Sequence, residues 1–235
     1  MKRLLAITLF CGLWISTPDR VEAKDKKAEA IKEALQDLQD YIGGWKGSGS
    51  PFRSRNVRDF WSVKLDWSWR FKKNDIYLSV SFRKSKFWKY GEMRYDPDDE
   101  QYQFKITDIK GGERVFTGEK DDRGYLTLKR VDPKTKEAQE IRLNTAAEGV
   151  RLVLSYSHKP KNRTRFIRDY RIGLTKDGES LGKVVKQREC IVTGGLGTMA
   201  VSYQGMTFWV CCSGCKDAFN ENPKKFIAEW KKKNK

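Results

Sequence analysis

Four cysteines near the end of the chain are the residues whose type and spacing best support a chemical role. Cys190 stands alone, and Cys211, Cys212 and Cys215 follow it after twenty intervening residues. Thiolates are soft ligands that suit Zn²⁺ or Cu(I), and Zn²⁺ takes about four of them in a tetrahedron. Neighbours in an extended segment point to opposite sides, so Cys211 and Cys212 are not expected to bind one ion together. The spacing therefore predicts a metal site formed by Cys190, Cys215 and one or both of the adjacent pair.

A disulfide framework is the alternative, because the beginning of the chain predicts export. Lys2 and Arg3 precede an apolar stretch, Leu4 to Ile15, and Ala23 ends a short segment of the kind that signal peptidases cleave. The apolar stretch is too short to anchor the chain permanently in a bilayer, and no other stretch is apolar enough to cross one. The mature protein is then periplasmic or extracellular and lacks Cys11. In such oxidising compartments an even set of cysteines often forms disulfides, so both interpretations stay open.

The charge of the chain favours anionic partners. The 235 residues carry a formal net charge of +17, with 38% hydrophobic and 12% aromatic residues. This composition supports a folded protein rather than a disordered one, and the basic excess is typical of binding to polyanions or of a lysine-rich solvated surface. Because export excludes nucleic acid as a specific natural partner, an anionic envelope polymer is the polyanion that we keep as a possible partner.

Hydrophobic periodicity divides the chain before the cysteines into a helix and a sheet. Residues Lys24 to Ile42 place apolar side chains three and four positions apart, which predicts an amphipathic helix ending at Gly43 and Gly44. From Phe60 to Leu174 apolar and polar residues alternate in short runs separated by Asp, Pro, Gly and Asn, as in Val63 to Phe71. Eight to ten strands with short loops and no helix between them predict an antiparallel up-and-down sheet, which closes into a barrel to remove its edges.

The cysteines fall in a small module of their own. Gln204 and Gly205 separate two short apolar runs and predict a hairpin, and Asn222 and Pro223 predict the start of a last helix. A hairpin and a short helical segment bury too little apolar surface to fold alone, so a metal or disulfides must hold them together. The predicted fold is thus mainly β, with a short helix, a barrel and a ββα module. The predicted divisions are 1–23 (signal peptide), 24–42 (helix), 43–175 (barrel), 176–187 (linker) and 188–235 (module).

Two resemblances to known families accompany these patterns. The sequence from Gly43 to Trp45, the run Leu65 to Phe71 and the later run Gly91 to Pro97 resemble lipocalin-like (calycin) bacterial barrels. That resemblance implies a cup that holds an apolar small molecule, although the barrel's own aromatic side chains would fill the same space. A heme-binding version would need a histidine, and His158, which we place in a loop, is the only one available. No heme is therefore expected.

The second resemblance lies in the module. Cys190 to Gly194, the aromatic pair Phe208 and Trp209, the Cys211–Cys215 spacing and the later Phe219 and Asn222–Pro223 are similar to the YHS/TRASH family of heavy-metal-binding domains. The resemblance implies metal ligation by Cys190, Cys211 and Cys215. It leaves Cys212 as a fourth ligand, a substitute for Cys211 or a free thiol, and Ile191 replaces the proline usual in the family.

The combined hypothesis is an exported protein that binds soft or borderline metal ions for sensing, sequestration or delivery. One alternative is a carrier of an apolar small molecule whose tail is held by zinc or disulfides, and a weaker one is a binder of envelope polymers. No Ser/His/Asp arrangement and no paired carboxylates stand out, so the sequence does not favour an enzyme.

Overall fold

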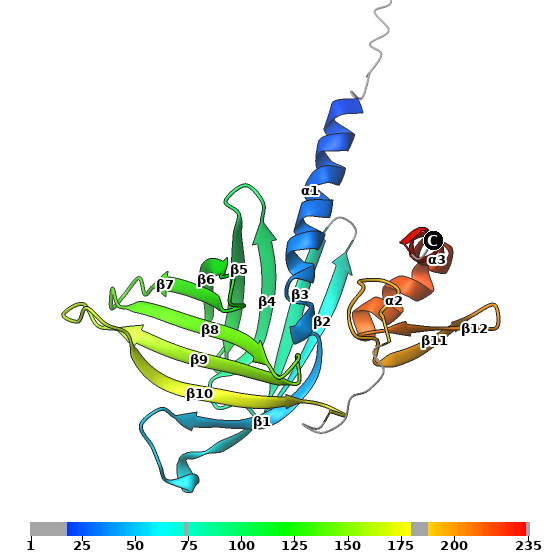
Figure 1. Cartoon of the computed structure of the whole chain (residues 1–235). Coiled ribbons are helices and arrows are strands. Elements are labelled where there is room, and N and C mark those ends of the chain that lie inside the picture. Colours follow the sequence, from blue (N-terminus) through cyan, green and yellow to red (C-terminus); the bar gives the residue numbers. More distant parts are fainter. Residues whose placement is uncertain (1–17, 73–74, 180–187, 234–235) are drawn as a thin grey trace, which may run out of the picture.

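The computed structural model describes residues 18–72, 75–179 and 188–233 (Figure 1). A long helix α1 (Pro18–Gln36) and a short 3₁₀ helix η1 (Gln39–Tyr41) precede a ten-stranded barrel. The barrel strands are β1 (Gly43–Pro51), β2 (Trp61–Lys72), β3 (Asp75–Arg83), β4 (Trp88–Asp96), β5 (Gln101–Asp108), β6 (Glu113–Lys120), β7 (Leu126–Val131), β8 (Ala138–Ala146), β9 (Arg151–Lys159) and β10 (Ile167–Lys176). A second 3₁₀ helix, η2 (Val57–Asp59), lies between β1 and β2.

Every barrel strand pairs antiparallel with the next one in the chain, and β1 pairs with β10 to close the sheet. The alternating sequence explains this arrangement, since the apolar positions face inward along each strand while the polar ones face outward. The turn glycines Gly111 and Gly124 have φ values of +88° and +81°, which residues with a side chain rarely adopt. The prediction of a mainly β fold with a closed up-and-down barrel is confirmed.

The helix before the barrel differs from the predicted range of 24–42. It begins earlier, at Pro18, and its α-helical part ends at Gln36. The chain then tightens, with backbone N–H groups of Leu38, Tyr41 and Ile42 donating to carbonyl oxygens three residues earlier. This tight turn brings the side chains of Leu35, Leu38, Tyr41 and Ile42 into the core at one end of the barrel. Burial of these residues therefore outweighs continued α-helix, and we call this end the closed end.

Large side chains fill the half of the barrel next to the closed end. Those with no measurable exposure are Trp45, Trp67, Trp69, Met93, Phe104 and Phe116. The ring centroids of Tyr41 and Trp67 are 5.8 Å apart. The Trp45 indole N–H donates to the Tyr41 carbonyl oxygen at 2.7 Å. The barrel's own side chains thus occupy this half, and a cavity lies at the opposite end.

The C-terminal module consists of the predicted hairpin and two helices, α2 in addition to the last helix that Asn222 and Pro223 predict. Its elements are β11 (Met199–Tyr203), β12 (Met206–Val210), α2 (Ser213–Glu221) and α3 (Pro223–Lys233). Gln204 and Gly205 both have positive φ values, 49° and 76°, which is the geometry of a tight two-residue hairpin turn. Pro223 is the first residue of α3, a position at which a missing N–H costs nothing.

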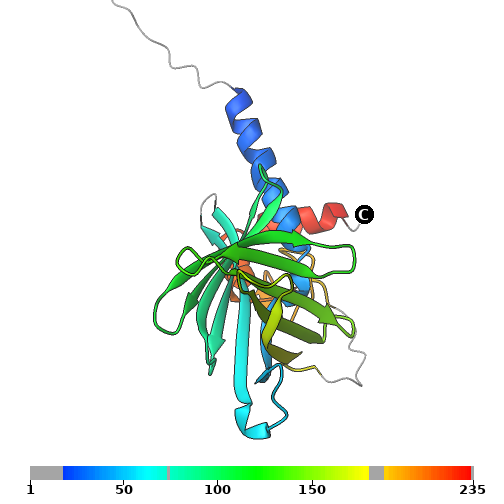
Figure 2. The same cartoon turned by 90° about the vertical axis from the view of Figure 1, so that its left-hand side faces the viewer.

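The module packs against a strand edge that the barrel leaves open. The pairing of β1 with β2 runs from Trp61 to Trp67, so β2 continues for five residues without a partner on that side. Helix α2 packs there, and Ser68 on the outward side of β2 is buried as a result. Figure 1 shows the module beside β2, and Figure 2 shows β6 to β8 in front with the module behind them. The cysteines and the free space of the barrel therefore lie at different places in the molecule.

Two predictions fall wholly or largely on parts of the chain outside the described residues. Most of the predicted signal peptide, with Cys11, lies in residues 1–17, and most of the predicted linker lies in residues 180–187. Among the described residues, no helix has both the length and the apolar character needed to span a bilayer.

Candidate metal centre

Three cysteine sulfurs converge in the interior of the module. The Sγ atoms of Cys190, Cys211 and Cys215 all lie within 4.8 Å of one another, and that of Cys211 is 3.4 Å from that of Cys215. The three residues are 1%, 3% and 0% exposed. All are free thiols. The structure therefore brings together residues from both limbs of the tail, as a thiolate site requires.

A tight loop positions Cys190. Its backbone N–H donates to the Gly195 carbonyl oxygen at 2.6 Å, and the Gly194 N–H returns to the Cys190 carbonyl oxygen at 2.8 Å. Gly194 has a φ of +77°, a conformation that favours glycine. The Ile191 N–H also donates to the carbonyl oxygen of Trp209 in β12. The loop is thereby tied to the strand that leads directly into the other cysteines.

The start of helix α2 positions the remaining cysteines. Cys211 follows the last residue of β12, Cys212 is the N-cap of α2 with extended backbone, and Cys215 lies in the first helical turn. The N-terminal end of a helix carries partial positive charge, which favours thiolates over thiols. A strand running straight into a helix start thus places two ligand candidates one turn apart on the same side.

The sulfur of Cys212 has different neighbours. It lies 3.9 Å from the Cys211 sulfur but outside the group of three, and it accepts a hydrogen bond from the backbone N–H of Trp69 at 3.3 Å. This N–H belongs to the open edge of β2. Cys211 thus belongs to the group whose three sulfurs are all mutually close, whereas Cys212 contacts the sulfurs of Cys211 and Cys215 and also connects the module to the barrel.

Hydrogen bonds among the four cysteine side chains shift their pKa values in opposite directions. Hydrogen bonds from the Cys211 and Cys215 thiols lower the pKa of Cys190, and the same two thiols lower the pKa of Cys212. The donors show the opposite effect, since the pKa values of Cys211 and Cys215 are raised by these hydrogen bonds. Thr193 Oγ1 lies 3.6 Å from the Cys211 sulfur and adds a polar contact. The lowered pKa values of Cys190 and Cys212 favour their thiolate forms, which are the forms that bind metal ions.

Sequence reasoning missed the contacts that fix this group to the rest of the protein. The Gln36 side chain donates to the Thr193 carbonyl oxygen at 3.1 Å, and Gln39 packs so closely on Gly195 that a Cβ there would fall 2.1 Å from its side chain. These residues lie in or just after α1, about 150 positions away in the chain. No spacing pattern marks such contacts in a single sequence.

His158 lies in β9 rather than in the loop that we expected. Tyr156 and His158 continue the inward-facing positions of that strand, which ends only at Lys159, before Pro160. The His158 Nδ1 atom is 2.8 Å from a carboxylate oxygen of Asp169 in the neighbouring strand β10. The histidine is thus part of the barrel wall, far along the chain from the cysteines.

Comparison with family models and curated proteins found no relative of this chain. The functional argument accordingly rests on the residues themselves.

Proposed function

We propose that Cys190, Cys211 and Cys215 bind one soft or borderline metal ion, Zn²⁺ or Cu(I), as thiolates. The observation that carries this proposal is the buried group of three free sulfurs. A Zn–S bond of about 2.3 Å places tetrahedral sulfurs about 3.8 Å apart. The distance of 3.4 Å between Cys211 and Cys215 needs only a small change of side-chain rotamer to reach that spacing.

The ligand type determines which ions fit. Three thiolates are soft donors, and soft donors favour Cu(I) and Zn²⁺ over Mg²⁺ or Ca²⁺, which prefer oxygen. Three ligands leave a fourth position for Cys212, for a small molecule or for a thiol of a partner. A site with an exchangeable fourth ligand supports capture and transfer of the ion, and so a role in sensing, sequestration or delivery rather than catalysis. The resemblance to YHS/TRASH domains at the same cysteines supports this role.

The signal-like first residues support action outside the cytoplasm. We propose that the chain is exported and cleaved after Ala23. N-terminal sequencing of the protein from the cell envelope should then begin at Lys24. A protein that keeps its first residues and stays in the cytoplasm would contradict export but not metal binding.

Metal binding is tested with the reduced chain from Lys24 onward. Competition against a chromophoric chelator should give one Zn²⁺ or Cu(I) per chain. Cys190→Ser, Cys211→Ser and Cys215→Ser should each weaken binding at least about 100-fold, because each removes a ligand.

Cys212→Ser is the matched control, since it changes a neighbouring cysteine outside the group. It should keep the 1:1 stoichiometry and lose about 10-fold or less in affinity. Equal losses in all four variants would contradict the assignment of three ligands. Protein isolated without reductant that holds disulfides and no metal would support the disulfide alternative instead.

A further inference from the structure

The end of the barrel opposite the closed end contains a cavity of about 650 Å³, which we call the cup. It lies among the first residues of β2, β4, β6 and β10 and the last residues of β5 and β9. The residues that determine its chemistry include Phe87, Trp88, Asp108, Arg114, Tyr156 and Tyr170. The cup is thus part aromatic and part charged.

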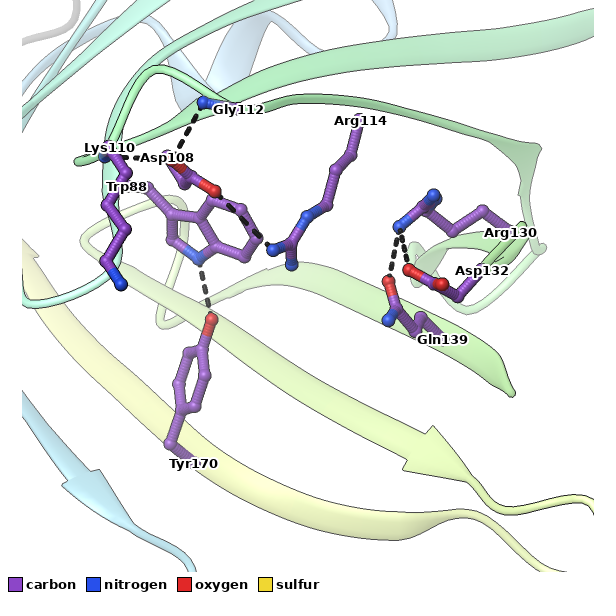
Figure 3. Close-up of polar contacts among 9 residues, drawn as sticks. All are labelled: Trp88, Asp108, Lys110, Gly112, Arg114, Arg130, Asp132, Gln139 and Tyr170. Carbon is purple, nitrogen blue, oxygen red and sulfur yellow. Dashed lines mark hydrogen bonds and ion pairs between the residues drawn. The ribbon is translucent and has the colours of Figure 1, made fainter. Parts of the chain in front are cut away.

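Parallel aromatic rings form one wall of the cup. The Tyr170 ring stacks on that of Phe87, with a centroid distance of 4.5 Å and an interplanar angle of 14°. It also stacks on the Tyr156 ring, with a centroid distance of 5.3 Å and an angle of 12°. Trp61 meets both Phe87 and Tyr170 edge-on. The Trp88 indole N–H donates to the Tyr170 hydroxyl at 2.6 Å and fixes the ring orientation (Figure 3). Such a wall offers a rigid surface for stacking a flat ring.

A guanidinium group reaches into the space beside this wall. Arg114 lies over the Trp88 ring, and one of its nitrogens is 3.5 Å from a carboxylate oxygen of Asp108 (Figure 3). Asp108 is itself held by the backbone N–H groups of Lys110 and Gly112, which lower its pKa. Because its one ion pair is long, Arg114 retains donors in a forked arrangement that suits an oxyanion.

The formal charges that line the cup balance, because Lys86, Lys110 and Arg114 stand against Asp108, Glu137 and Asp169. Asp108 and Asp169 are engaged by Arg114 and His158, whereas no carboxylate partner within the described ranges contacts the ammonium groups of Lys86 and Lys110. Glu137, near the start of β8, is the opposing acidic group at the rim. The formal charge of +17 on the whole chain also draws anions toward the protein.

We propose that the cup binds a small planar aromatic anion, with its ring against the aromatic wall formed by Phe87, Tyr156 and Tyr170 and its carboxylate or similar oxyanion on Arg114. This site goes beyond metal binding and involves none of the cysteines. A neutral apolar ligand would cover the Arg114 guanidinium and leave the N–H groups that do not face Asp108 without an acceptor, which is costly. An anionic ligand supplies that partner while its ring covers the aromatic wall.

The test uses two fluorescent probes that differ by one charged group. Anilinonaphthalene sulfonate carries an aromatic system and an anion, and phenylnaphthylamine has the same rings without the sulfonate. The full-length mature protein should bind the sulfonate probe with 1:1 saturation and at least about 10-fold more tightly than the neutral probe, as a charge-assisted hydrogen bond predicts. Arg114→Gln should weaken binding of the sulfonate probe about 10-fold and leave the neutral probe unchanged.

Two further variants keep the test decisive. Arg171→Gln removes an exposed arginine next to Tyr170 in the chain but outside the cup, so it should not change binding of either probe. Tyr156→Leu removes part of the aromatic wall and should weaken binding of both probes.

Tighter or equal binding of the neutral probe would overturn the proposal in favour of an apolar ligand. Equal loss in Arg114→Gln and Arg171→Gln, or no saturable binding, would also overturn it. Cysteine variants should leave probe binding intact, which separates this site from the metal site.

Discussion

Two buried tyrosines near the closed end of the barrel differ in what their hydroxyl groups contact. The Tyr102 hydroxyl donates to the Ala34 carbonyl oxygen in α1 at 2.7 Å, whereas the Tyr41 hydroxyl is buried and contacts no polar group in the described part of the protein. Burial raises the pKa of both tyrosines above the ordinary value, so both stay protonated in neutral solution. A buried hydroxyl that lacks a partner costs free energy, while one that has a partner contributes to stability.

Removing each hydroxyl should therefore have opposite effects on stability. Tyr102→Phe should lower the free energy of unfolding by about 1 kcal/mol because the Ala34 carbonyl loses its donor. Tyr41→Phe keeps the ring between Trp67 and its neighbours and should leave that free energy unchanged or raise it by about 1 kcal/mol. Equilibrium urea denaturation of the two variants measures the difference. A larger loss in Tyr41→Phe than in Tyr102→Phe would contradict this account.

Residue type and spacing predicted that Cys190 and Cys215 come together with Cys211, Cys212 or both, and the family resemblance favoured Cys211. The structure places the sulfurs of Cys190, Cys211 and Cys215 in one group. The role of Cys212 could not be predicted, because it depends on the Trp69 N–H, 143 positions earlier. Such a contact depends on where a strand loses its partner, which a local pattern does not report.

At the scale of elements, helix α2 fits against strand β2 only because Gly214 has no side chain. A Cβ at this position would lie 1.7 Å from the Trp69 carbonyl oxygen. Backbone on both sides makes this overlap hard to relieve. The close approach brings Cys212 within hydrogen-bonding distance of the same residue.

Gly214→Ala should consequently weaken the contact between the module and the barrel. We expect the free energy of unfolding to fall by about 3 kcal/mol, as in overpacked interiors. Ser213→Ala changes the exposed neighbouring residue of the same helix and should stay within about 0.5 kcal/mol of wild type. Urea denaturation followed by tryptophan fluorescence compares the two, and equal stability of both variants would contradict the close approach.

Most strands follow from alternation, but some boundaries do not. Strand β2 shows the expected period up to Trp67 and then buries Trp67, Ser68 and Trp69 in succession, because the module covers its outer face. Helix α1 ends before its apolar pattern does, since the residues after Gln36 turn into the core. In each case tertiary burial overrides the local period, so periodicity alone places the element but not its end.

At the scale of the whole molecule, the Trp69 N–H links the proposed metal site to the barrel. Its acceptor is the sulfur of Cys212, next in the chain to the proposed ligand Cys211. Local unfolding that breaks this hydrogen bond also disturbs the cysteines. A metal bound to them should therefore raise the free energy of that local unfolding. With free metal at a hundred times its dissociation constant, the linkage is worth about 2.7 kcal/mol.

Hydrogen exchange measures this linkage. Adding Zn²⁺ should slow exchange of the Trp69 amide by up to about 100-fold when exchange occurs through loss of the module contact. Amides of β8, on the far side of the barrel, serve as the internal control and should change much less. Equal slowing in β2 and β8, or none in either, would contradict a path through Cys212.

The late start of β1, at Gly43 opposite Trp67, has a last consequence for chain integrity. A bare strand edge is a template on which another chain adds a strand. The five residues of β2 beyond Trp67 form such an edge, and here the module shields it. Proteolytic loss of the tail would thus expose this edge to pairing with another chain, so the tail also protects the barrel against aggregation.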